Sequence, residues 1–256
     1  MVVTTVFGGM VGFVGRLLSG RGVVQLVAVA VAGLVAMAGA IVFGVWGSAQ
    51  VGIGEGAQRY PSFVWWVINR LLYLAAVGSI QSFAQYYIQH TLGLTKEQAA
   101  DMTGSLMMIV GIFTLLSALP SGYLADKFGR KRWVALTGVV AAVGTALLLV
   151  STSTTMVMVS GCIIGLSAGA FMTTNWALGT DLVPSEEAGR YLGISNLAGA
   201  GAGVVGAGIG GPMADFFNSY RPGLGYLVVF AIYGAIFLLS SLVLVKVREP
   251  AIGRAA

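Results

Sequence analysis

The sequence predicts an all-α membrane protein, a polytopic bundle of helices that crosses the bilayer several times. Hydrophobic residues make up 57% of its 256 positions, charged residues only 9%, and the mean hydropathy is +0.89. A soluble domain of this length needs a mixed and charged surface, which so few charges cannot provide. A bilayer accepts apolar side chains on the outside of the bundle. The apolar runs are long and lack the polar alternation of a membrane barrel, so strands are not expected.

The lengths of the apolar runs predict eight membrane spans, since each span needs about 20 mostly apolar residues to cross about 30 Å of hydrocarbon. A short span is expected over residues 3–19 and a clear one from Val23 to about Trp46. Six more are expected near 63–92, 102–125, 133–151, 156–182, 194–218 and 225–247. No basic residue precedes the first apolar stretch, so a cleaved secretory signal is not indicated.

These spans divide the chain into three parts. Residues 1–62 hold two N-terminal membrane segments and a cytoplasmic linker, residues 63–248 form a six-helix bundle, and residues 249–256 form a tail. The sole cysteine, Cys162, lies in an apolar run, so neither an intrachain disulfide nor a cysteine metal site is expected.

The basic residues predict the orientation of the chain in the cytoplasmic membrane. The net charge is +5, but the cations stand in short clusters between apolar runs, a pattern typical of topology signals and not of nucleic-acid binding. Alternating the connections places nine cations inside: Arg59, Lys127, Arg130, Lys131, Arg132, Arg190, Lys246, Arg248 and Arg254. Four lie outside: Arg16, Arg21, Lys96 and Arg221. Both termini are therefore expected in the cytoplasm.

One connection concentrates charge. Residues 122–133 read GYLADKFGRKRW, with five charged residues among the seven positions from Asp126 to Arg132. A topology signal accounts for the cations but not for Asp126 or Gly129. The pattern G-x-L-A-D-[RK]-x-G-R-[KR] resembles the signature loop of the major facilitator superfamily, which lies between the second and third helices of each half of these transporters.

The resemblance extends to both sides of this connection. Residues 161–194 are similar to the fourth and fifth helices of a half, and residues 65–94 to the seventh helix of a twelve-helix member. It implies that residues 63–248 are the C-terminal six-helix half, preceded by two spans that correspond to helices five and six. Most of an N-terminal half has no counterpart in this sequence.

The resemblance implies a secondary transporter, or half of one, that moves a small solute by alternating access. Two alternatives stay open: a structural or assembly subunit that keeps the half-fold, and a truncated piece of a full transporter. By resemblance, Asp126, Gly129 and Arg130 form a conformational latch that stabilises the outward-open state, while Lys131 and Arg132 act as topology charges. Gly122 and Gly129 are expected to permit a tight turn or a close backbone approach between helix ends.

Polar side chains at membrane depth indicate a cavity or a partner helix. In the 63–92 span, Tyr73, Gln81 and Gln85 are separated by multiples of four residues and form one slowly rotating stripe. We expect it to line a cavity for a polar or amphipathic solute; contacts between helices are the alternative. Arg70 is expected to reach the interface or to pair with a carboxylate.

The 156–182 span carries a second group of polar residues. Asn175 and Trp176 are candidate substrate contacts, because an amide and an indole offer hydrogen bonds and a stacking face. Asp181 is expected to form an ion pair with Arg190 or with residues 126–132, in preference to carrying a coupled proton.

Residues 201–206 read GAGVVG, which matches a dinucleotide-binding pattern in letters only, since it lies within a membrane span and follows no strand. We interpret Gly199, Gly203, Gly206 and Gly210 as helix-packing positions. No catalytic constellation or metal-ligand spacing is present, so neither an enzyme, nor a metal, nor a cofactor is expected. The expected partners are membrane lipid, an unknown small solute, and a second copy or another membrane chain, paired across the face with Gln81, Gln85 and Asn175.

Overall fold

The computed structural model describes residues 22–54, 56–183 and 186–248. These residues are almost entirely helical and include no strand, which confirms the predicted fold class. The helices are α2 (Val23–Ile53), α3 (Gly56–Arg59), α4 (Pro61–Leu92), α5 (Lys96–Phe128), α6 (Arg130–Leu149), α7 (Thr154–Asp181), α8 (Ala188–Tyr220) and α9 (Leu224–Val243), followed by the 3₁₀ turn η1 (Leu244–Lys246). The span predicted over residues 3–19 lies outside the described residues.

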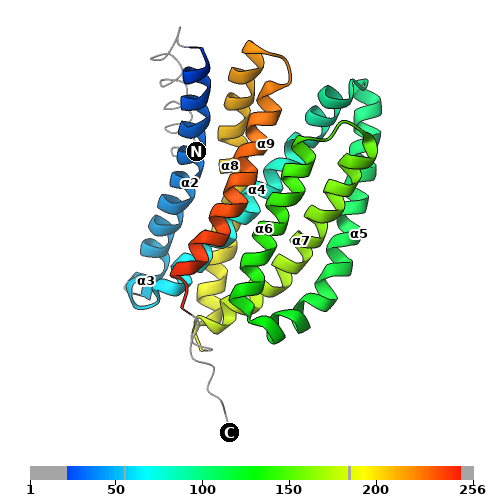
Figure 1. The fold of residues 1–256 in the computed structure, drawn as a ribbon. Coiled ribbons are helices and arrows are strands. Elements are labelled where there is room, and N and C mark those ends of the chain that lie inside the picture. Colours follow the sequence, from blue (N-terminus) through cyan, green and yellow to red (C-terminus); the bar gives the residue numbers. More distant parts are fainter. Residues whose placement is uncertain (1–21, 55, 184–185, 249–256) are drawn as a thin grey trace.

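Six of the described helices are long and apolar enough to cross a membrane: α2, α4, α5, α6, α7 and α9. The glycine-rich α8, 33 residues long, coincides with the predicted span over 194–218 but is not one of these six. The long helices run side by side (Figure 1), with α7 between α5 and α6 and with α2 at the opposite edge. Helix α4 packs against α8 and α9 and is the most buried of the six, whereas α5 is the most exposed.

Local sequence signals set several helix ends. Pro61 occupies the first turn of α4, where its missing N–H costs nothing. Thr95 begins α5 with a capping box: its hydroxyl accepts from the Gln98 backbone at 3.3 Å, and the Gln98 side chain accepts from the Thr95 backbone at 3.1 Å.

The link between α5 and α6 is shorter than the sequence suggests. Helix α5 continues to Phe128 and α6 begins at Arg130, so Gly129 alone joins them, with φ of +94°. Glycine adopts this conformation without the steric cost that a Cβ would impose. The expectation for Gly122 is wrong in both forms, because that residue lies inside α5 and a Cβ added to it would meet no described atom of another helix within 4 Å. The positive φ of Gly129 is the backbone feature that turns the chain.

Close packing joins α7 to α5. A Cβ added to Gly169 of α7 would lie 1.9 Å from the carbonyl oxygen of Thr114 in α5, and one added to Gly165 would lie 2.6 Å from that of Val110. Both distances are shorter than any side chain tolerates, so glycine is required for the two backbones to approach this closely.

Two hydrogen bonds bring segments that are distant in sequence together at one end of the bundle. The Lys131 ammonium donates to the Val247 carbonyl at 2.6 Å, and the Arg248 backbone N–H donates to the Ser62 hydroxyl at 3.1 Å. The starts of α4 and α6 and the end of the described chain therefore lie together, at the lower end in Figure 1. We call this the inner end, and the opposite one, which carries Thr95, the outer end.

Candidate functional site

An ion-pair triad made of Asp126, Arg130 and Asp181 connects three helices at the inner end. Arg130, the first residue of α6, donates from Nε to Oδ1 of Asp126 in the last turn of α5 at 3.0 Å. Its Nη1 donates to both carboxylate oxygens of Asp181 at the end of α7, at 2.8 and 2.9 Å, and to the Ala177 carbonyl at 3.2 Å. The expected pairs of Arg130 with Asp126 and of Asp181 with residues 126–132 are both present.

The triad is partly exposed, with 31% of the Arg130 side chain, 64% of Asp126 and 35% of Asp181 accessible. Ion pairs at such positions contribute about 0–1 kcal/mol each, because water screens them. The Asp126–Arg130 pair is local, four residues apart, whereas the Arg130–Asp181 pair holds α6 against α7. Contacts of this strength can be made in one conformation and broken in another.

A second polar cluster lies inside the bundle, between α4, α7 and α9. Arg70 donates from Nη1 to Oδ1 of Asn175 at 3.3 Å, and Nδ2 of Asn175 donates to Oδ1 of Asn69 at 2.9 Å. Nδ2 of Asn69 in turn donates to the Ser240 carbonyl at 2.8 Å. The Trp66 indole N–H donates to the Asn175 carbonyl at 2.9 Å. We call Trp66, Asn69, Arg70, Asn175 and Trp176 the inner polar cluster.

The expectation that Arg70 reaches the interface or pairs with a carboxylate is wrong. Its side chain is 4% exposed, and no Asp or Glu of the described residues forms an ion pair with it. Helix α4 packs against α2, α5, α7, α8 and α9, and Arg70 is among its buried residues. The Trp176 ring lies 4.4 Å from the guanidinium carbon and provides a cation–π contact.

The predicted cavity stripe on α4 is split by the structure. Tyr73 is buried, stacks on Phe171 with ring centroids 3.6 Å apart, and lies 2.6 Å from the Ser167 hydroxyl. Since Ser167 donates to the Thr137 carbonyl, Tyr73 is the donor in this bond. Gln81 is exposed and Gln85 half-buried. Four residues turn an α-helix by about 40° beyond a full turn, so eight residues carry a position from the core to the surface.

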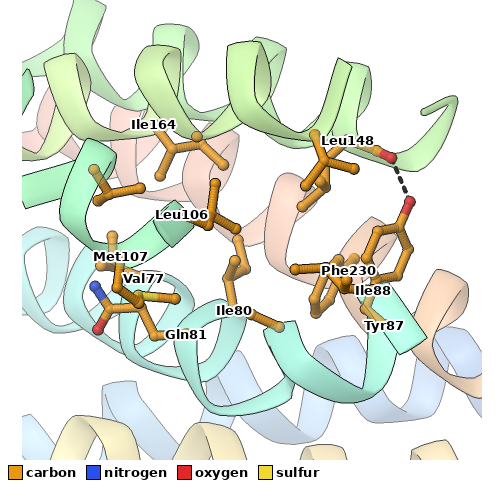
Figure 2. A pocket seen from close by; sticks show the side chains of 14 residues that line it. Val77, Ile80, Gln81, Tyr87, Ile88, Leu106, Met107, Leu148, Ile164 and Phe230 are labelled. Carbon is orange, nitrogen blue, oxygen red and sulfur yellow. Dashed lines mark hydrogen bonds between the residues drawn. The ribbon is translucent and has the colours of Figure 1, made fainter. Parts of the chain in front are cut away.

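Gln81 borders a small apolar pocket in the outer half of the bundle (Figure 2), with a volume of about 30 Å³. Its lining comes from α4, α5, α6, α7 and α9 and is aliphatic apart from Gln81, Met107, Tyr87 and Phe230. In Figure 2 the Gln81 amide lies beside Met107 and Val77, and the Tyr87 hydroxyl donates to the Leu148 carbonyl on the other side. The structure thus groups Asn175 and Trp176 with Arg70 and leaves Gln81 and Gln85 further along α4.

Two of the four glycines interpreted as packing positions contact neighbouring helices. A Cβ on Gly206 would lie 1.9 Å from the Ser79 hydroxyl of α4, and one on Gly210 would lie 2.3 Å from the Tyr233 hydroxyl of α9. Gly199 and Gly203 lie in α8, outside the residues whose packing the structure describes. Among the described residues, no group of His, Cys, Asp and Glu could hold a metal ion.

Sequence reasoning missed the connection between Asn69, Arg70 and Asn175. The signal was present, because Asn69 and Arg70 are adjacent polar residues in an apolar helix and Asn175 is an amide in another. Their pairing depends on which faces of α4 and α7 meet, and periodicity alone does not specify that.

Comparison with known proteins identifies the family. A family model described as Major Facilitator Superfamily matches residues 66–256, which include most of α4 and all of α5 to α9. The chain resembles the glucose transporter GlcP of Staphylococcus epidermidis, with 30% identity over 141 residues, 55% of this chain and 30% of that protein. It resembles the minor myo-inositol transporter IolF of Bacillus subtilis, with 35% identity over 94 residues, 37% of this chain and 22% of that protein.

A longer match of lower identity is the multidrug resistance protein MdtG of Enterobacter lignolyticus, 26% identical over 193 residues, 75% of this chain and 44% of that protein. The chain therefore spans less than half the length of each of these three relatives.

The inner polar cluster predicts a large effect of removing the Asn175 side chain. Asn175→Ala leaves Arg70 without its acceptor and Asn69 without its donor, and each unpaired buried group costs about 1–3 kcal/mol. We expect the thermal unfolding midpoint of the detergent-solubilised protein to fall clearly. Thr180→Ala, on the exposed side of α7, is the matched control and is expected to change stability by less than about 0.5 kcal/mol. Equal midpoints for the two variants would contradict the role of Asn175.

Proposed function

Because this chain belongs to the major facilitator superfamily, we propose that it is a secondary transporter, or half of one, that moves a small solute across the cytoplasmic membrane by alternating access. The observation that supports the proposal best is the position of Arg130, which bonds Asp126 and Asp181 and so joins the inner ends of α5, α6 and α7. A transporter that opens alternately to the two sides needs contacts at one end that form in one state and break in the other.

In this proposal Asp126, Gly129 and Arg130 form the conformational latch, and Asp181 completes it. Gly129 turns the chain so that Arg130 begins α6 directly beside the last turns of α5 and α7. When the triad is formed, α6 and α7 are held together at the inner end. Its modest strength suits a switch, because a pair worth about 1 kcal/mol changes a conformational equilibrium about fivefold without locking it.

The solute would meet polar groups at two depths. Gln81 and Gln85 offer amides in the outer half of α4, and the half-buried Trp176 offers an indole nearer the triad. Asn175 and Arg70, which are buried and bonded to each other, would hold Trp176 from behind. Tyr73, buried and already bonded to Ser167, would support the wall behind them. Two relatives are named for glucose and myo-inositol, solutes whose hydroxyl groups amides can bind, and a third for multidrug resistance. We propose a small polar or amphipathic solute.

The latch is tested with Asp126→Asn and Asp181→Asn. Each substitution removes charge-assisted bonds to Arg130, and we expect the ratio of inward-open to outward-open forms to change about fivefold. The measurement is the rate at which an impermeant thiol reagent modifies a cysteine at Gln85, on a background without Cys162. Lys127→Gln removes a neighbouring charge that is outside the triad and serves as the control. If all three variants react at the same rate as the parent, Asp126 and Asp181 are topology charges only.

We propose that the inner end faces the cytoplasm and that both termini lie there. Nine of the basic residues fall on this side in the alternating arrangement, against four on the other. Cysteines placed at Arg132 and at Lys96, both exposed, report the two sides. In intact cells an impermeant reagent is expected to modify the cysteine at position 96 and to leave position 132 unmodified until the cells are opened. Modification of both in intact cells would refute this orientation.

We also propose that the chain works paired with a second copy of itself or with another membrane chain. In this superfamily the two halves are related by an axis along the membrane normal, and a two-fold dimer would reproduce that arrangement. The exposed amide of Gln81 in the outer half of α4 is costly in lipid. Asn175, expected on the same face, is fully buried and cannot belong to it. The pairing face therefore keeps Gln81 and Gln85 and loses Asn175.

Cross-linking tests the pairing. A cysteine at Gln85, on a background without Cys162, is expected to form a cross-linked dimer in membranes, or a cross-link to a second membrane protein. A cysteine at Val139, which is exposed on α6, is the control and is expected to give none. A monomer that transports solute in liposomes and gives no cross-link would refute the proposal. A cross-linked pair that moves no solute would favour an assembly subunit over a transporter.

A further inference from the structure

An apolar groove lies between α5, α6 and α7 towards the inner end, with a volume of about 260 Å³. Its walls are Leu116, Pro120 and Leu124 from α5 and Trp133, Leu136 and Val140 from α6. Helices α5 and α6 are joined by Gly129 alone, but each packs mainly on α7, which lies between them (Figure 1). Because α7 keeps α5 and α6 apart, a groove remains between them. Leu116 and Leu136 are exposed at its rim, which therefore opens towards the membrane. The volume of the groove is many times the volume that one water molecule needs, which is about 10–15 Å³.

The groove offers one unused hydrogen-bond donor. Its hydroxyl groups already donate to backbone carbonyls: Ser117 to Thr114, Ser121 to Ser117, Thr137 to Val134 and Ser167 to Thr137. The indole N–H of Trp133 is buried and has no partner among the described residues. An indole nitrogen can only donate, and a buried donor without an acceptor is costly. The groove therefore fits a ligand that is mostly apolar and carries a hydrogen-bond acceptor near the inner end.

Two cations stand at the inner mouth of the groove, one on each wall. Lys127 follows Leu124 by three residues on α5, and Arg132 precedes Leu136 by four on α6, so each lies one helical turn closer to the inner end on the same side as the lining. Both are exposed, and neither forms an ion pair with a described residue. The nearest acid in sequence, Asp126, is bonded to Arg130. The mouth is therefore positively charged.

We propose that this groove binds an anionic phospholipid. One acyl chain lies between α5 and α6, a glycerol ester carbonyl accepts from the Trp133 indole, and the headgroup phosphate lies between Lys127 and Arg132. Along the groove the apolar walls come first, then the Trp133 donor and then the two cations. A phospholipid has the matching order of acyl chain, ester carbonyl and phosphate. A helix of a partner protein fits less well, because its backbone brings no anion to the two cations at the mouth, whereas the phosphate of a phospholipid does.

The test is native mass spectrometry of the full chain in detergent, titrated with phosphatidylglycerol or phosphatidylcholine. We expect phosphatidylglycerol to bind more tightly, and the double variant Lys127→Gln, Arg132→Gln to lose most of that preference, about fivefold for each cation removed. The matched control removes Lys96 and Arg221, two exposed cations at the outer end, and is expected to keep it. Equal losses in the two double variants would overturn the site.

Two further variants test the groove itself. Leu136→Trp fills it and is expected to weaken phosphatidylglycerol binding at least tenfold, whereas Val143→Trp, exposed on α6 but outside the lining, is expected to leave it unchanged. Trp133→Phe keeps the ring, removes the N–H donor and is expected to weaken binding of both lipids without changing their ratio. If Leu136→Trp and Val143→Trp bind alike, the cations attract lipid at the surface only and the proposal of a groove site fails.

Discussion

The absence of water inside a bilayer decides where this chain can place its polar groups. A polar group that finds no partner within the protein costs several kcal/mol there. Most hydroxyls in the helices meet this requirement locally: Ser82 donates to the Gly78 carbonyl, Thr103 to Ala99 and Thr145 to Ala141, each four residues back. The inner polar cluster cannot be satisfied locally. Asn69 and Asn175 therefore bond across helices, and the network fixes which faces of α4, α7 and α9 meet.

The same constraint separates two arginines by role. Arg70 is held by an amide oxygen and an indole face deep in the bundle, and removing either would leave a buried cation poorly compensated. Arg130 makes more and shorter bonds, to two carboxylates, yet at a border where water screens them. The buried contact is thus expensive to break and suits architecture, while the partly exposed one is inexpensive to break and suits a conformational switch.

Hydropathy and length were sufficient to predict the fold class and the approximate positions of the described spans, because a membrane helix must supply its own hydrogen bonds over a fixed thickness. The four-residue spacing of Asp126 and Arg130, about one helical turn, was sufficient to predict their ion pair. The burial of Arg70 and the separation of Tyr73 from Gln81 could not be predicted in this way. Both depend on the rotation of α4 against its neighbours, and a stripe that turns by about 40° every four residues does not show which end faces the core. The one-residue link at Gly129 was not predicted, because the charged residues around it were interpreted as a loop although they lie in α5 and α6.

The last two turns of α7 bring the two clusters together. Asn175 and Trp176 contact Arg70, while the Ala177 carbonyl and Asp181 contact Arg130. Four residues within a seven-residue segment of one helix therefore contact the two arginines, of which one lies inside the bundle and one at its inner end. A helix moves as a nearly rigid element, so a displacement of this segment along its axis alters both sets of contacts at once. Glycines of α7 hold it tightly against the middle of α5, and Arg130 bonds the inner ends of both helices through Asp126 and Asp181, so the two helices are coupled at both places.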